Sequence, residues 1–247
     1  MARRDDILDF ARELLDLDSF QDYGPMGLQV VGADEVTKIA AAVSSSLELF
    51  ERAAEAGAQL VIVHHGLLWD ADPRIVDRPM RRRLQALFDA DITLAAYHLA
   101  LDAHLEIGNN VLLARELGAD SPERVLDLGF GGRLDPPLTL DELTRRLRDA
   151  TGREPQVFDG GPERIGRVAV ITGGAARLFP QVAAAGYDAF VTGEPSEPTL
   201  HAVRELGAHF LAGGHYATET FGIKALAERI AQRFELEWEF LDLPNPV

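Results

Sequence analysis

The pattern of apolar and polar positions predicts short strands that alternate with helices in the first half of the chain. Strands are predicted at residues 38–43, 59–63 and 92–97, and helices at about 5–17, 46–56 and 79–90. Gly57 is the stop signal of the second helix, and residues 22–29, with two glycines and a proline, are predicted to form a loop. Short apolar strands that alternate with helices indicate a sheet covered on both faces, and hence an α/β fold.

The second half repeats this order at a constant shift of 129 positions. Residues 38–43 align with 167–172 and residues 59–63 with 188–192, while Gly57 aligns with Gly186. The repeat predicts two similar α/β domains related by internal duplication, residues 1–125 and 126–247, with a C-terminal segment that packs back on the first. Two unrelated strand-helix-strand units of equal length would also align in this way, so duplication is one of two interpretations.

Each half contains a histidine and a carboxylate residue four positions apart, just after a predicted strand. His98 and Asp102 follow the strand at 92–97, and His215 and Glu219 follow a strand at 208–212. The carboxyl ends of strands are where α/β sheets place their ligand sites. We therefore expect a site in the cleft between the two domains, with His98 either a metal ligand or a group that orients one.

A pair of adjacent histidines, His64 and His65, stands at the end of another apolar strand. The pair alone is weak evidence, but together with the two His/carboxylate elements it provides more donors than one tetrahedral metal site requires. The sequence therefore predicts two divalent metal ions, with Glu219 as the bridging carboxylate and these ligands: His64, His65, Asp102, His215 and Glu219.

Composition narrows the chemistry and the compartment. The chain has 247 residues and no cysteine, so a metal must be bound by nitrogen and oxygen, a ligand set that suits Zn, Mn, Fe, Co or Ni. A net charge of −16 argues against nucleic acid as a partner, and the one basic cluster, Arg81-Arg82-Arg83, is interpreted as a solvated helix face. The N-terminus lacks the features of a signal peptide and no segment is apolar enough to span a membrane, so we expect a cytoplasmic protein without a membrane partner.

Five motifs spread over nearly the full length resemble the GTP cyclohydrolase 1 type 2 family, also called dinuclear-metal-centre hexameric proteins. The motifs are Gly27-Leu-Gln29, His64-His-Gly-Leu-Leu-Trp69, Leu101-Asp-Ala-His-Leu-Glu-Ile-Gly-Asn-Asn110, Val191-Thr-Gly-Glu194 and Gly214-His-Tyr-Ala-Thr-Glu219. The resemblance implies that the five ligands above bind two divalent metals. It also implies a toroidal homohexamer and the named reaction of the family, hydrolytic opening of the guanine imidazole ring of GTP.

The expected function is thus that of a metal-dependent hydrolase acting on a small molecule such as a nucleotide, with His98 or Glu194 as the candidate proton donor. Trp69 and Tyr97 either stack on a base or pack at strand ends, and His104 lines the site. A two-metal centre serves a phosphoesterase or a peptidase equally well. A non-catalytic metal-binding or regulatory ring is a further alternative. His201 and His209 are expected on a helix face and in a strand.

Overall fold

The computed structural model describes residues 1–247 and has the predicted mixed α/β fold, in two compact units. Unit 1 comprises Met1–Leu101 and Gly222–Leu243, and unit 2 comprises Asp102–Phe221 and Pro244–Val247. This division differs from a boundary after residue 125. Strand β7 (Ala119–Val125) pairs with β8 (Gly129–Leu138) in unit 2, and β13 (Glu237–Phe240) pairs with β4 (Lys38–Ser44) in unit 1.

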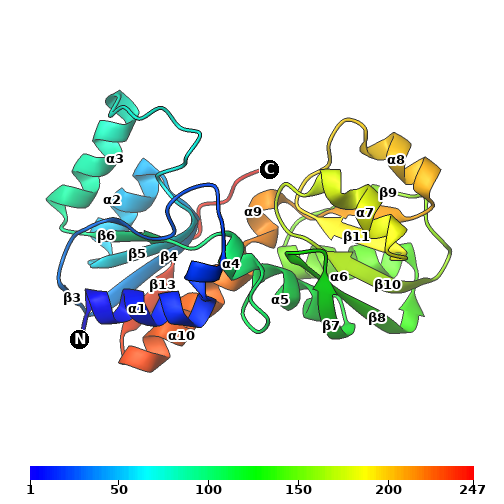
Figure 1. Ribbon diagram of the computed structural model, residues 1–247, viewed down its shortest axis with the longest axis horizontal. Coiled ribbons are helices and arrows are strands. Elements are labelled where there is room, and N and C mark those ends of the chain that lie inside the picture. The colour runs from blue at the N-terminus through cyan, green and yellow to red at the C-terminus, as the bar shows by residue number, and fades with distance from the viewer. The chain divides into compact units, whose positions relative to one another are not determined.

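Unit 1 contains a five-stranded sheet of order β13-β4-β5-β6-β2 (Figure 1). The other three strands are β5 (Leu60–His65), β6 (Thr93–Ala96) and β2 (Gly27–Val30). The first four strands of this order are parallel, and β2 pairs with β6 in the antiparallel sense. A separate two-stranded ribbon joins β1 (Ala2–Arg3) to β3 (Glu35–Val36).

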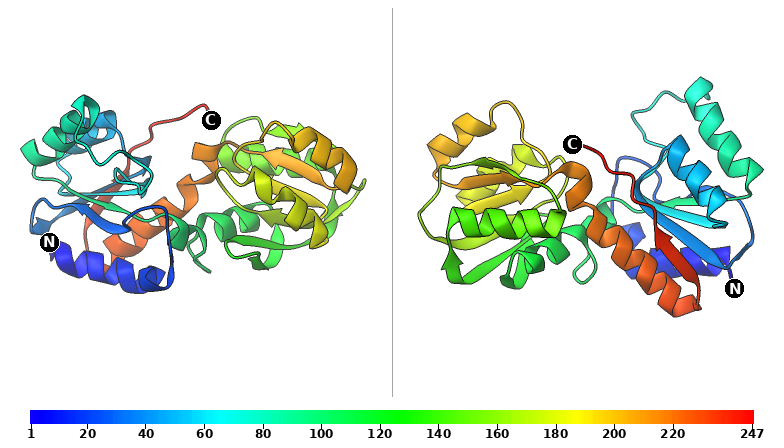
Figure 2. Two further views of the ribbon diagram at one scale, coloured as in Figure 1. Left: turned by 45° about the horizontal axis from the view of Figure 1, so that its top comes forward. Right: turned by 180° about the vertical axis from the view of Figure 1, so that it is seen from behind.

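Helices cover both faces of this sheet, and the cores lie between the layers (Figures 1 and 2). On one face lie α2 (Leu47–Glu55) and α3 (Arg78–Asp89), whose residues Phe50 and Leu87 pack on the sheet. On the other face lie α1 (Arg4–Leu15) and α10 (Thr220–Phe234). The Ser46 and Asp77 side chains accept hydrogen bonds from backbone N–H groups of the first turns of α2 and α3, so both helices start where a polar cap is available. The short elements are η1 (Leu17–Ser19) and α4 (Leu99–Asp102).

Unit 2 contains a six-stranded sheet of order β7-β8-β10-β11-β12-β9. The remaining strands are β9 (Gln156–Phe158), β10 (Ile165–Val170), β11 (Ala189–Thr192) and β12 (His209–Ala212). Strands β10, β11 and β12 are parallel and the outer strands antiparallel. One face packs against α5 (Asn109–Glu116) and α6 (Leu140–Thr151), and the other against α7 (Phe179–Ala184) and α8 (Thr199–Leu206). The short helices are η2 (Ala176–Leu178) and α9 (His215–Thr218).

The first two parallel strands of each unit, β4 with β5 and β10 with β11, pair in the same register under the shift of 129 positions. Ile39 lies opposite Leu60 in unit 1, and Val168 lies opposite Ala189 in unit 2. The third parallel strand of each unit does not keep this shift, and duplication stays a prediction.

One local prediction was wrong. Residues 27–30 form β2 instead of a loop, because pairing with β6 overrides the local glycine signal. Strand β5 extends through His65, so the histidine pair forms the end of this strand. No helix is both long enough and apolar enough to cross a membrane.

Candidate metal centre

The histidine pair of unit 1 is oriented by neighbouring strands. His64 is fully buried, and its Nδ1 lies 2.8 Å from the carbonyl oxygen of Tyr97. Because a carbonyl can only accept, this Nδ1 carries the proton, and Nε2 bears the lone pair that can bind a metal. The Nδ1 of His65 lies 2.9 Å from Oγ of Ser44, its partner in the parallel β4–β5 pairing. Anchoring of one ring nitrogen is the usual arrangement of metal-binding histidines.

His98 adds a third imidazole to this pair. Its ring centroid lies 5.0 Å from that of His64 and 5.6 Å from that of His65. The candidate ligand atoms of the three residues lie within 4.8 Å of one another. The Nδ1 of His98 lies 2.8 Å from Oδ1 of Asp22, so this ring too is anchored through Nδ1. Unit 1 therefore gathers three oriented imidazoles.

Asp22 is a part of this arrangement that the sequence analysis missed. Its side chain is 2% exposed, and its Oδ2 accepts a hydrogen bond of 2.8 Å from the backbone N–H of Leu99. Burial would raise the pKa of Asp22, but the hydrogen bond and charge of His98, together with the N–H groups of Tyr23 and Leu99, outweigh burial and lower that pKa. Asp22 thus carries its charge beside His98. It stands in an aperiodic loop 76 positions from His98, so no sequence pattern could connect the two.

The loop after the histidine pair is held by Gln29. The Oε1 of Gln29 accepts a hydrogen bond of 2.7 Å from the N–H of Leu67, and a Cβ on Gly66 would collide with the Gln29 side chain. This loop carries Trp69, whose ring centroid lies 5.2 Å from that of His98. Tyr97 is fully buried, and burial raises the pKa of its hydroxyl. Tyr97 is therefore a packing residue, whereas Trp69 borders the imidazole cluster.

In unit 2, His215 and Glu219 lie at the two ends of one short turn. Helix α9 comprises only His215–Thr218, and Glu219 follows it directly. The Nε2 of His215 lies 3.3 Å from Oε2 of Glu219, and its Nδ1 lies 3.1 Å from Oε1 of Glu194. Burial lowers the pKa of His215, but the hydrogen bonds and charges of the two glutamates outweigh it and raise that pKa to about 9.

The loop after β10 packs directly against this pair. Gly173 has a φ of +68°, and a Cβ at this position would overlap Oε1 of Glu219 and lie 3.2 Å from Nε2 of His215. The backbone N–H of Gly193 donates a 2.9 Å hydrogen bond to the carbonyl of Gly173. A Thr-Gly pair stands at the end of each of two parallel strands: Thr172-Gly173 comes shortly after β10, and Thr192-Gly193 ends β11. This repeated pair is the signal by which the sequence could have identified the close approach.

Asp102 ends helix α4 and is buried, with 7% exposure. Its Oδ1 accepts a hydrogen bond of 2.8 Å from Nδ2 of Asn109, and Asn110 donates to its backbone carbonyl. The Oδ1 of Asn110 in turn accepts from the N–H of Thr172 at 2.7 Å. The Asn109-Asn110 part of the motif thus orients Asp102, whose candidate ligand oxygen lies within 4.8 Å of that of Glu219.

The remaining histidines have other surroundings. The Nδ1 of His104 accepts hydrogen bonds from the N–H groups of Glu106 and Ile107, which stabilises the turn before α5. His201 is exposed on α8. His209 is buried in β12, with its Nε2 2.9 Å from the carbonyl of Pro162.

The residues fit divalent metals. Unit 1 offers imidazoles tied through Nδ1, and unit 2 offers two buried carboxylates and an imidazole, which is the nitrogen and oxygen ligand set of first-row metals. The fold and these clusters define an α/β protein with candidate metal-binding groups of histidine and acidic side chains at the carboxyl ends of parallel strands.

Comparisons with known proteins give the family. The family model described as Duf34/NIF3 (NGG1p interacting factor 3) matches residues 2–246, and the chain belongs to this family. A "GTP cyclohydrolase 1 type 2 homolog" from Pseudomonas aeruginosa is 44% identical over 245 residues, covering 97% of each chain. The protein of the same name from Escherichia coli (strain K12) is 43% identical over 235 residues, covering 95% of each. The crystal structure of TTHA1606 from Thermus thermophilus has a TM-score of 0.94 and 40% identity over 100% of both chains. The resemblance inferred from the motifs is confirmed.

Proposed function

We propose that this chain is a cytoplasmic, metal-dependent hydrolase with a dinuclear centre. The two metal ions are bound by His64, His65, Asp102, His215 and Glu219. Zn, Mn, Fe, Co and Ni all suit this ligand set, and the choice among them depends on availability. The family resemblance supports a homohexamer as the working assembly and a small molecule such as a nucleotide as the substrate.

One observation carries the proposal most strongly: the three imidazoles of unit 1 are anchored through Nδ1, with candidate ligand atoms within 4.8 Å of one another. Three neighbouring rings held in this way are poor packing residues but good metal ligands, because Nε2 of a neutral ring bears a lone pair. The set in unit 1 lacks a carboxylate, and Asp102 and Glu219 in unit 2 would supply the two that a pair of cations needs.

The chain's own residues supply positioning and proton transfer. His98, tied at Nδ1 to the charged Asp22, can accept or give a proton at Nε2. The side chain of Glu194 is 38% exposed, and it contacts Nδ1 of His215 and orients that ring. This positioning role competes with donation of a proton from Glu194 to the substrate. Trp69 provides an aromatic edge beside His98 for a planar substrate. Divalent cations, when bound, supply Lewis acidity, which makes water a nucleophile near neutral pH and polarises the bond under attack.

The relatives named GTP cyclohydrolase 1 type 2 homolog make GTP the first substrate to test. One water would add at C8 of the guanine and open the imidazole ring to a formamide. A second water would hydrolyse the formamide and release formate. A proton must reach the departing ring nitrogen in the first step, and His98 is our candidate donor.

The test measures formate release from GTP by wild-type protein, H64A and H201A, each reconstituted with Mn, Zn or Fe and assayed for bound metal. We expect H64A to lose at least one metal per chain and its turnover. H201A, in which an exposed histidine is removed, serves as the matched control and keeps both. Formate release that is unchanged in H64A would exclude the proposed site.

The same samples separate the alternatives. Turnover of a phosphate ester or a peptide, but not of GTP, would assign the centre to a phosphoesterase or a peptidase. Metal binding that raises the melting temperature without turnover of any class would favour a non-catalytic ring, since a metal that binds only the native state stabilises it by mass action.

A further inference from the structure

The turn that begins α9 is bounded by residues of unit 2 to which the proposed centre gives no role. Strand β9 pairs with β12 in the antiparallel sense, with Gln156 opposite Ala212. Continued past the ends of these strands, this register places residues 153–155 alongside residues 213–215. The fold therefore brings Arg153 beside the backbone that presents the proposed histidine ligand of unit 2.

The Arg153 side chain packs on Gly214, the residue before this histidine. A Cβ on Gly214 would lie 2.6 Å from both Cδ and Nη1 of Arg153, so the absence of a side chain makes room for the arginine. Gly214 also has a φ of +97°, which favours glycine. Its N–H donates a hydrogen bond of 2.8 Å to the carbonyl oxygen of Gly193. Gly214 is thus held both by the loop after β11 and by Arg153.

The guanidinium of Arg153 in turn holds the segment 244–247. Its Nη2 donates a hydrogen bond of 2.8 Å to the carbonyl oxygen of Pro246. The backbone oxygen of Val247 accepts a hydrogen bond of 3.2 Å from the N–H of Tyr216, a group in the first turn of a helix that has no partner within that helix. Two of the four residues of this segment are prolines, whose rings restrict the backbone. Arg153 and the segment together therefore contact the residues on both sides of the proposed ligand.

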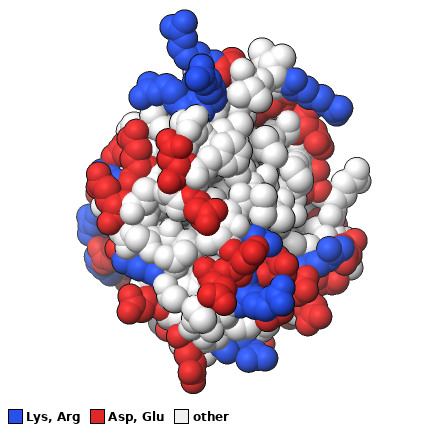
Figure 3. Space-filling view, turned by 90° about the vertical axis from the view of Figure 1, so that its left-hand side faces the viewer, with Lys and Arg blue, Asp and Glu red and all other residues white.

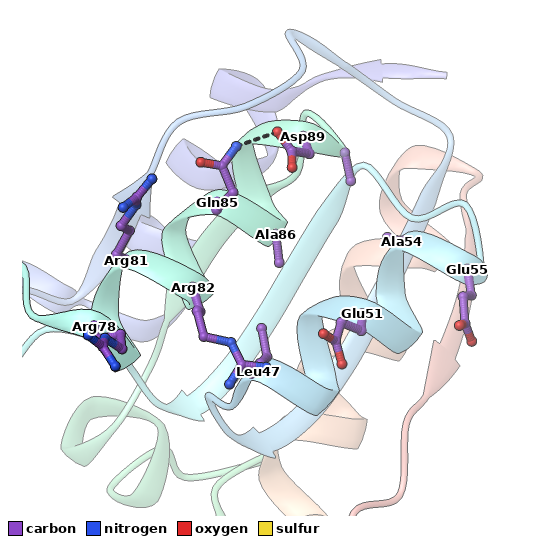
Figure 4. A pocket seen from close by; sticks show the side chains of 11 residues that line it. Leu47, Glu51, Ala54, Glu55, Arg78, Arg81, Arg82, Gln85, Ala86 and Asp89 are labelled. Atoms are coloured by element: carbon purple, nitrogen blue, oxygen red, sulfur yellow. Dashed lines mark hydrogen bonds between the residues drawn. The ribbon is translucent and has the colours of Figure 1, made fainter.

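The arginines of α3 have no such contacts. Arg78, Arg81 and Arg82 line a groove of about 720 Å³ between α2 and α3, and none of their guanidinium groups makes a hydrogen bond or ion pair. Figure 4 shows these side chains along α3, and in Figure 3 basic side chains gather along the upper edge of the visible face. Arg153 is instead fixed to backbone atoms beside the turn. The α3 arginines thus provide a control for the loss of charge alone.

We propose that Arg153 is a positioning residue of the metal centre, which holds His215 in place through Gly214 and through the segment 244–247. This inference rests on the proposed function, because it takes His215 as a metal ligand. A ligand side chain must be held within about 0.5 Å of its working position, and the backbone on both sides of His215 sets that position. Loss of a residue that orients a ligand typically weakens metal binding about 10–100-fold. Truncation of Arg153 should therefore weaken metal binding although every ligand is still present.

The test compares R153A, R146A and R82A in the full chain, each titrated with Co²⁺. Arg146 is the matched control, because it is also partly buried, donates a hydrogen bond of 2.7 Å from Nη1 to the carbonyl oxygen of Leu117, and packs on Gly118, which has a positive φ. R82A removes the same charge from an exposed side chain. We expect R153A to bind Co²⁺ about 10–100-fold more weakly and to change the visible absorption of the bound ion, which reports its coordination geometry. Both controls should match the wild type.

A second readout requires no metal. Hydrogen–deuterium exchange mass spectrometry of the metal-free protein follows the peptide that contains Tyr216. We expect R153A to lose protection in this peptide, because the Tyr216 amide no longer has an ordered acceptor, whereas R146A should keep it. R153K keeps a cationic donor on an aliphatic stem but lacks the planar fork of arginine, so it should recover part of both the metal affinity and the protection.

Each outcome decides the proposal. Weaker Co²⁺ binding, an altered spectrum and lost protection in R153A, with none of these changes in the two controls, support it. Equal Co²⁺ affinity in R153A and R146A overturns it, as does unchanged exchange in R153A. Weaker GTP binding in R153A with unchanged Co²⁺ binding would also overturn it, and would assign the guanidinium to the substrate. A wild type that binds no Co²⁺ would overturn the proposed centre and the positioning role with it, and lost protection in R153A would then show only that Arg153 holds the turn.

Discussion

Substitution of Gly173 by alanine tests whether the loop after β10 sets the position of Glu219. Two effects combine at this residue. Its φ of +68° lies in the left-handed region that side chains disfavour, and the new Cβ would overlap Oε1 of Glu219 and approach Nε2 of His215. The first effect acts on the backbone alone, and the second displaces a proposed metal ligand.

A control variant separates the two effects. Gly152 has a φ of +71°, and a Cβ there would meet no atom within 4 Å. G152A therefore reports backbone strain alone, about 1–2 kcal/mol of unfolding free energy for an alanine held in this conformation. G173A should carry a similar loss. In addition, displacement of a ligand by its supporting residue typically weakens metal binding about 10–100-fold, or roughly 1.4–2.7 kcal/mol.

Urea denaturation gives the unfolding free energies, and isothermal titration calorimetry with Mn or Zn gives the affinities. We expect G152A to bind metal as the wild type does, and G173A to bind more weakly. Equal metal affinity in G173A and G152A would refute the claim that this loop positions the carboxylate, whatever the two stabilities.

Two further results are expected. D22N should unfold more easily than the wild type at pH 7. Because the pKa of Asp22 is lowered in the folded state, its contribution to the free energy of unfolding is present above the ordinary pKa of 3.8 and is lost as pH falls through the folded pKa. The difference in unfolding free energy between wild type and D22N should therefore shrink below about pH 4. A difference that stays constant with pH would argue against a charged Asp22. Metal binding should release a proton from His215, whose pKa is raised to about 9, so affinity should rise by up to about tenfold per pH unit as pH approaches 9. Calorimetry in buffers of different ionisation enthalpy counts this proton, and a count of zero would contradict the role of His215.

The sequence was informative where burial imposes a simple pattern. The continuous apolar runs that became β4 and β5 predict central parallel strands, because such strands are buried on both faces. The antiparallel strands β7 and β8 were missed for a physical reason. They contain Pro122, Pro136, Pro137 and several glycines, and their pairing depends on neighbouring strands instead of local preference.

The candidate site divides in the same way. His64, His65 and His215 could be found because their side chains follow or end apolar strands at a recognisable spacing. The groups that orient these histidines could not be predicted from the sequence. From the sequence, Ser44 is simply the last residue of a strand, and nothing indicates its contact with His65. The group of Tyr97 that contacts His64 is the backbone carbonyl, so the residue type gives no sign of the contact.

The position of β13 has a consequence for biosynthesis. This strand pairs with β4 and completes the sheet of unit 1, whose other four strands lie between Gly27 and Ala96. Helix α10 covers the same sheet with Ile223, Leu226 and Ile230. While residues 102–221 leave the ribosome, the sheet of unit 1 in the nascent polypeptide therefore lacks both β13 and the covering helix α10. The usual order, in which the N-terminal module matures first, is reversed here, and the early sheet is a natural client for chaperones that shield apolar surface.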